Sequence, residues 1–120
     1  MTFYDLHGKP IAYLDDDMET IYLFKGQPVA YLPGDGTVYG FNGNHIGWLD
    51  NGWIRDLAGY CVFFTEDARG SGPIKLVKKI TPVKSVQHAK PVQHVKRVKS
   101  AKSANKLSWS KLSGEIFFLQ

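Results

Sequence analysis

The sequence contains little cysteine, no long apolar run and no recognisable targeting segment, and each shortage excludes a class of protein. Cys61 is the only cysteine in 120 residues, which excludes an intramolecular disulfide framework and is typical of a reducing cytoplasm. No apolar run approaches the roughly 20 residues that a membrane-spanning helix needs. The first residues, MTFYDLHGKP, lack a basic segment followed by an apolar one, so we expect no signal peptide. We therefore expect a cytoplasmic chain with no membrane partner.

The chain is short, but it is rich in residues that form a core. Hydrophobic residues make up 43% of it and aromatic residues 13%, which excludes a chain that is disordered throughout. Its length suits one domain, because two separate cores would not fit. The composition predicts one small globular domain.

Charge is distributed unevenly along the chain. Residues 1–68 carry a net charge of −7, whereas residues 69–120 carry +11. The boundary lies at Arg69-Gly70-Ser71-Gly72-Pro73, a stretch that opposes regular structure. A basic half can attract the acidic half of the same molecule, or it can bind an external polyanion. The charge pattern leaves both alternatives open.

A fourfold repeat occupies residues 3–68. Gly8, Gly26, Gly43 and Gly59 are separated by 18, 17 and 16 residues. The surrounding text recurs as FYDLHGKPIAYL, IYLFKGQPVAYL, VYGFNGNHIGWL and IRDLAGYCVFF. Each unit reads as a strand, a turn with glycine and a second strand, and Asn42-Gly43 predicts a type I′ turn. The repeat predicts four β-hairpins.

Alternation within each unit suggests how the hairpins assemble. One face carries large residues such as Tyr4, Tyr22 and Tyr39, with Arg55 at the same place in the fourth unit. A lone hairpin is marginally stable in water, so four copies are expected to bury these rows around a common axis. The sequence therefore predicts an all-β fold with four hairpin repeats arranged radially with pseudo-fourfold symmetry. The second face, which is also apolar, then needs cover from the rest of the chain.

Residues 74–107, which we call the arm, follow a period of three. An aliphatic residue or alanine recurs at every third position from Ile74 to Leu107, with lysines between, and Pro73, Pro82 and Pro91 lie nine residues apart. Polyproline II has three residues per turn and tolerates proline, whereas helices and strands have other periods. We expect an extended, polyproline II-like arm that wraps the body and lays its valines on the second apolar face. A disordered lysine-rich tail is the alternative.

The end of the chain regains strand character in Glu115–Leu119, and we expect it to dock on the body as a short strand. The predicted organisation is a single domain made of a hairpin body (1–68), a Gly/Ser/Pro linker (69–73), the arm (74–107) and a C-terminal strand segment (108–120).

The hairpin units, the valine-lysine arm and the stretches NGWIRD, GYCVFFTEDA and LSWSKLSGE resemble the bacterial family called the 4-fold β-flower. The resemblance covers the whole chain. It implies four hairpin petals around a pseudo-fourfold axis, and it implies no activity, because no function is established for that family.

The sequence offers few residues for chemistry. Cys61 lies in the apolar strand YCVFF, and there is no nucleophile elbow, phosphate loop or dinucleotide fingerprint. The four histidines lack the spacing of a zinc site, and the acidic connector at residues 15–19 lacks a calcium-loop pattern. We expect no enzyme, no cofactor and no metal.

Two candidate binding regions remain. Aromatic and polar residues are dense around the third connector, which makes a small-ligand site there the main candidate: Trp48, Asp50, Asn51, Trp53, Arg55 and Asp56. The interpretation that we favour for this cluster is that the tryptophans fill the core and Arg55 pairs with Asp56 or Asp50, and if a pocket exists we expect it here.

The second candidate region is the basic arm, which would bind nucleic acid or another polyanion through Lys78, Lys79, Lys84, Lys90, Lys96, Arg97, Lys99 and Lys102. Nucleic acid is the less favoured partner, because the arm lacks aromatic residues for base stacking and the front half repels phosphate. The sequence thus predicts a non-catalytic interaction or small-ligand-binding module, with polyanion binding as the alternative. It leaves the partner and the oligomeric state open.

Overall fold

A computed structural model describes all residues, 1–120, and shows eight short strands followed by one short helix. Each strand pairs antiparallel with the next, and β8 pairs with β1, so that the strands form a closed barrel. The elements are β1 (Thr2–Tyr4), β2 (Pro10–Leu14), β3 (Thr20–Leu23), β4 (Pro28–Tyr31), β5 (Thr37–Tyr39), β6 (His45–Asp50), β7 (Trp53–Asp56), β8 (Cys61–Phe64) and the 3₁₀ helix η1 (Glu115–Leu119).

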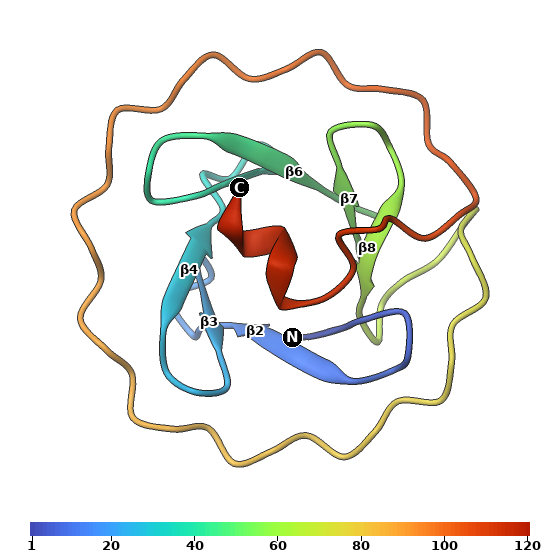
Figure 1. Cartoon of the computed structure of the whole chain (residues 1–120), viewed down its shortest axis with the longest axis horizontal. Coiled ribbons are helices and arrows are strands. Elements are labelled where there is room, and N and C mark those ends of the chain that lie inside the picture. Colours follow the sequence, from blue (N-terminus) through green and yellow to red (C-terminus); the bar gives the residue numbers. More distant parts are fainter.

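The strands form four hairpins, which we call petals 1 to 4: β1–β2, β3–β4, β5–β6 and β7–β8. Figure 1 shows the petals around one centre, with residues 74–107 running around them as an outer ring. The molecule is a flat disc with extents of 35 × 35 × 22 Å. The arm is therefore part of the disc.

The same turn closes all four petals. In petal 3 the amide of Gly43 donates to the Gly40 carbonyl, and the amide of Gly40 donates to the Asn44 carbonyl. Gly43 has a φ of +89°, whereas Asn42 does not have a positive φ. The petal turns are thus type I turns followed by a glycine bulge, and the predicted type I′ turn at Asn42-Gly43 is wrong. Each petal shows the register shift that such a bulge produces.

The barrel axis is lined by the smaller apolar face of the strands. Ala12, Ile21, Val38 and Ile54 belong to this axial core, together with Phe117 of η1. The tyrosine rows face outward instead, where they stack between neighbouring petals, as in the Tyr13–Tyr22 pair. The prediction that the large aromatic rows meet at the axis is wrong. Eight strands leave limited room at the centre, which small and aliphatic side chains fill together with Phe3, Phe63 and Phe117, so the tyrosine rings occupy the wider outer space.

Backbone hydrogen bonds attach the arm to the petals. The amides of Lys79, His88, Arg97 and Lys106 donate to the carbonyls of Gly8, Gly26, Gly43 and Gly59, at 2.8–3.0 Å. A Cβ on any of these four glycines would overlap an arm carbonyl, that of Val77, Val86, Val95 or Ala104 respectively. The petal glycines therefore serve two purposes, since they supply positive φ for the turn and allow the arm to approach closely.

These contacts reveal a nine-residue repeat in the arm that matches the petals one to one. The donor amides recur every nine residues, and so do the four carbonyls that face the glycines. A basic residue or histidine occupies the donor position each time, as Lys79, His88, Arg97 and Lys106. In the sequence, the nine-residue spacing of the three prolines is a sign of this repeat.

The aliphatic residues of the arm face solvent, so the prediction that they cover an apolar face is wrong. Eight of them are 84–95% exposed. The three-residue repeat has three sides. One side carries the amides that bond to the petals, and a second carries most of the lysines, which reach over aromatic rings such as Tyr13. The third side, with the valines, has nothing left to cover. The exposed residues are Ile74, Val77, Ile80, Val83, Val86, Val92, Val95 and Val98.

The end of the chain forms a helix, so the predicted C-terminal strand at Glu115–Leu119 is wrong. A closed barrel has no free edge that could accept a strand there. The segment instead enters η1 through Gly114, whose φ is +123°, and places Phe117 on the barrel axis. One isolated parallel bridge, Cys61 with Trp109, is the only strand-like contact of this segment. No helix in the structure has the length and apolar character that a membrane crossing requires.

Candidate functional site

The six residues of the predicted ligand site lie on or beside the β6–β7 ladder. Trp48 is opposite Arg55, and Asp50 is opposite Trp53, across a two-residue turn in which Asn51 and Gly52 both have positive φ. The residues are therefore neighbours in space as well as in sequence. Their polar groups, however, are largely engaged within the protein.

Arg55 joins the two ends of the arm. Its Nη1 donates to the carbonyls of Gly59, at 2.9 Å, and Lys106, at 2.8 Å, and its Nη2 donates to the Ser71 carbonyl at 2.7 Å. Ser71 precedes the arm and Lys106 lies near its end, where Figure 1 shows that the ring closes. The side chain is 2% exposed. Arg55 replaces the tyrosine of the other petals because this petal must hold both ends of the ring.

The remaining residues of the group also bind other parts of the chain. Trp53 is buried and donates from its indole nitrogen to the Arg69 carbonyl at 3.0 Å. Asp50 accepts from Lys102 Nζ at 2.9 Å, and this hydrogen bond lowers the pKa of Asp50. Lys102 also lies over the ring of Trp48. These contacts hold the arm and its flanking residues on petals 3 and 4, and they face no cavity.

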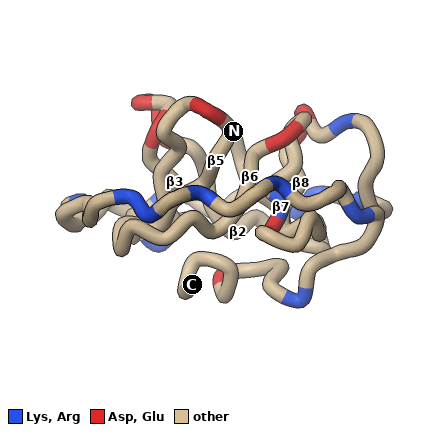
Figure 2. The backbone as a smooth tube through the Cα atoms, turned by 90° about the horizontal axis from the view of Figure 1, so that it is seen from above, with Lys and Arg blue, Asp and Glu red and all other residues tan.

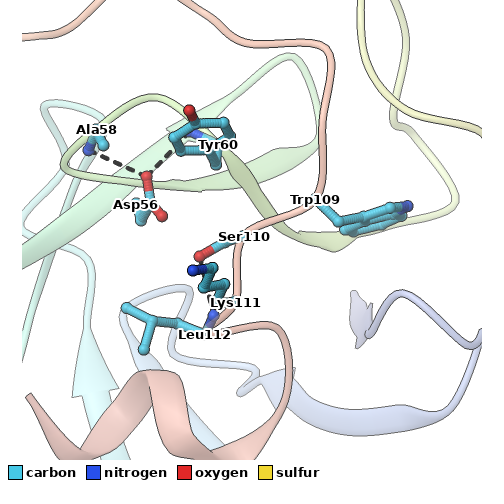
Figure 3. Close-up of a pocket in the computed structure, with 7 residues that line it drawn as sticks. All are labelled: Asp56, Ala58, Tyr60, Trp109, Ser110, Lys111 and Leu112. Carbon is cyan, nitrogen blue, oxygen red and sulfur yellow. Dashed lines mark hydrogen bonds between the residues drawn. The ribbon is translucent and has the colours of Figure 1, made fainter.

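Of the six residues, Asp56 alone lines a substantial cavity. This cavity, of about 600 Å³, opens between the turn of petal 4 and the C-terminal segment. Figure 3 shows it with its lining residues: Asp56, Ala58, Tyr60, Trp109, Ser110, Lys111 and Leu112. Only Asp56 was predicted as a site residue from the sequence, and the other six were not. Residues 109–112 are distant in sequence, so only the fold brings them to petal 4.

The cations of the predicted polyanion site form part of the rim. Lys90, Lys99 and Lys102 pair with Asp17, Asp35 and Asp50, at 3.5, 3.9 and 2.9 Å. The other five, Lys78, Lys79, Lys84, Lys96 and Arg97, have no carboxylate within 4.0 Å, although three of these lysines lie over tyrosine rings. Figure 2 shows most acidic residues on the face of the disc that carries the N-terminus, with the arm below them. The charge of the arm is thus only partly neutralised within the molecule.

Cys61 and His45, two buried side chains of types that can take part in catalysis, are held in unreactive forms. Burial raises the pKa of the Cys61 thiol to about 11, so the thiol stays protonated near neutral pH. Burial also lowers the pKa of His45. Its Nε2 donates to the Gly47 carbonyl at 2.8 Å, and its Nδ1 accepts a hydrogen bond from the amide of Ser100 at 3.0 Å. These two bonds hold the ring neutral and attach the arm to petal 3. No group of three or more His, Cys, Asp or Glu is arranged to hold a metal.

Comparison with known proteins identifies the family. No curated protein and no solved structure matches the chain. The model of one family, described as 4-fold beta flower protein, matches residues 1–118, which is nearly the full length and agrees with the closed all-β barrel. The chain belongs to the 4-fold beta flower family.

Proposed function

We propose that this chain is a non-catalytic interaction module, and that the outer side of the arm is the surface that binds its partner. The observation that carries this proposal is the row of eight exposed valines and isoleucines, each 84–95% exposed. Exposed aliphatic residues that occur singly are ordinary, but a regular row on one side of an ordered segment is not. The partner would present an apolar strip flanked by carboxylates, which match the lysines between the valines.

The spacing of the row sets the size of such a contact. We infer that the arm is polyproline II-like, which is supported by amides that turn toward the petals at positions separated by multiples of three. At a rise of ~3.1 Å per residue, successive aliphatic side chains are ~9 Å apart. A partner face of ordinary width would cover three of them. Burying each would contribute about 1.5–3 kcal/mol before the costs of association.

The engagement of the buried polar groups supports a binding role without catalysis. The thiol of Cys61 is held protonated, and the guanidinium of Arg55 is bound to three backbone carbonyls. Both ring nitrogens of His45 are also engaged. These groups stabilise the disc, and none presents a free reactive atom at a cavity.

Site-specific photocrosslinking of the full chain tests the proposal. A crosslinking residue at Val92, on the exposed row, is compared with one at Met18, which is 70% exposed on the connector between petals 1 and 2. We expect a discrete product from Val92 in the cells that normally express the chain, and its loss when Val86 and Val95 are replaced by threonine. Identical product patterns from Val92 and Met18 would contradict an interaction surface on the arm.

Polyanion binding is the second candidate, because five of the eight cations of the predicted polyanion site lack a carboxylate partner. It predicts retention on immobilised heparin and on duplex DNA that falls steeply with salt. The double variant Lys79→Gln/Arg97→Gln should then elute at lower salt than wild type. An interaction module that recognises a protein should instead pass through both columns at about 0.15 M salt.

A further inference from the structure

We propose that the cavity between petal 4 and the C-terminal segment binds a planar heteroaromatic ring that carries a hydrogen-bond donor beside an acceptor, the chemistry of a nucleobase edge. The site lies outside residues 74–107 and is independent of the surface proposed above. Two nearly buried polar side chains, Asp56 and Ser110, line it and each leaves one hydrogen-bonding position unused.

Asp56 offers a fixed acceptor. It ends β7 and is 8% exposed. Its Oδ1 accepts the turn amides of Ala58, at 3.0 Å, and Tyr60, at 2.9 Å, so that the carboxylate cannot rotate freely. Its Oδ2 accepts no hydrogen bond within the protein and is not one of the buried atoms closed off from solvent. Because Asp56 lines the cavity, the open side of this carboxylate faces it (Figure 3).

Ser110 offers a donor on the C-terminal segment, which lines the same cavity as Asp56. Its amide donates to the Cys61 carbonyl at 2.7 Å, which pins the segment to β8. Its Oγ accepts the amide of Leu112 at 3.0 Å, and its hydroxyl proton has no acceptor in the protein. The side chain is 7% exposed. An unused donor and an unused acceptor, each attached to rigid backbone, therefore line one cavity.

The walls of the cavity suit a flat ring. Tyr60 and Trp109 provide aromatic surface, and Leu112 provides an aliphatic floor. Tyr60 is held beneath Lys106, whose ammonium lies 5.5 Å from the ring centroid. The residues after the turn glycine in the other petals are Lys9, Gln27 and Asn44, so this aromatic wall is specific to petal 4. The cavity volume of about 600 Å³ is within the ~300–1,000 Å³ range of small-molecule sites.

The polar pair determines the ligand class. A hydrocarbon ring would leave the Asp56 oxygen and the Ser110 hydroxyl without partners after water is displaced, which is costly. A ring with an amino group beside a ring nitrogen gives a donor to Asp56 and an acceptor to Ser110. Aromatic side chains stack on such rings regardless of the base. Adenosine carries this edge and is the probe we choose.

The test is a titration of the isotopically labelled full chain with adenosine, followed by amide NMR. The amides of Ala58, Tyr60 and Leu112 bond directly to Asp56 and Ser110, so their shifts should move together on saturation. Toluene, which has a ring without the polar edge, serves as the control probe and should bind at least tenfold more weakly. Asp56→Asn keeps an oxygen for the turn but turns the free position into a donor, and should weaken adenosine binding about tenfold or more.

The first petal provides a matched control variant. Asp5 accepts the amides of His7 and Lys9 in the same turn, at 2.9 and 3.0 Å, but it does not line this cavity. Asp5→Asn should bind adenosine as wild type does. Ser110→Ala supplies a second variant of the site, should Asp56→Asn prevent folding, and should also weaken binding. The proposal is overturned if adenosine leaves the three amides unshifted at millimolar concentration, if toluene binds equally well, or if both site variants bind like Asp5→Asn.

Discussion

Replacement of Arg55 by methionine should lower the stability of the protein and release the ends of the arm. The guanidinium makes three hydrogen bonds, to the carbonyls of Gly59, Lys106 and Ser71. At about 1.5–3 kcal/mol for each bond to a charged group, these set a ceiling of roughly 4–9 kcal/mol. Removing the guanidinium also removes its desolvation penalty of several kcal/mol. We therefore expect Arg55→Met to lower the free energy of unfolding by about 2–4 kcal/mol.

Urea denaturation gives the total effect, and amide hydrogen exchange locates it. The arm ends should lose protection first, so the amide of Lys106 should exchange faster while the amide of His88, on petal 2, keeps more of its protection. Arg97→Met is the matched control, because Arg97 is exposed and its guanidinium makes no hydrogen bond within the protein. It should change stability by less than about 0.5 kcal/mol. A loss below about 1 kcal/mol for Arg55→Met, or equal loss of protection at both amides, would refute the view that Arg55 closes the ring.

Three further outcomes are expected. Burial lowers the pKa of His45 below its ordinary 6.5, so the stability that the neutral ring contributes is present above about pH 6.5 and is lost as the pH falls toward the lowered value. The melting temperature should therefore drop from about pH 7.5 to about 5, and His45→Asn, which keeps an acceptor for Ser100, should flatten this dependence. Gly34→Ala should lower the free energy of unfolding, measured by urea denaturation, by about 1–2 kcal/mol through positive φ alone. Gly26→Ala should lower it by about 1–3 kcal/mol more, because its Cβ also overlaps the Val86 carbonyl. Serine should replace four exposed valines with little effect, leaving the melting temperature within a few degrees of wild type by calorimetry; the four are Val83, Val86, Val92 and Val95. A large fall in the melting temperature would contradict their exposure.

The repeat could be read from sequence because its causes are local. A glycine that must adopt positive φ leaves a mark at each petal turn, and alternation of apolar residues marks each strand. The direction in which a strand face points is not a local property. Tyr22 and Ile21 both lie in β3 and both are buried, yet only closure of the barrel sends Ile21 to the axis and Tyr22 outward.

The candidate site was predictable only in part, for the same reason. The dense stretch from Trp48 to Asp56 did mark a place of special contacts, because Arg55 replaces a repeat tyrosine there. Its role, however, depends on Ser71 and Lys106, which approach petal 4 from opposite ends of the arm. Asp56 acquires a cavity only when Ser110 is placed beside it. No spacing in the sequence encodes the approach of Lys106 to Arg55 or of Ser110 to the cavity at Asp56, because each lies more than fifty positions away.

The sequence by itself determined the four hairpins, their turn glycines and the three-residue rhythm of the arm, since backbone conformation at each position depends on near neighbours. Tertiary structure decided which side of each element is buried. The barrel closed, which removed the free edge and turned the C-terminal segment into η1. The amides of the arm bond to the petals and its lysines lie over aromatic rings, so the valines face solvent. A periodic pattern defines the sides of a segment, but only the surface against which it packs determines which side faces solvent.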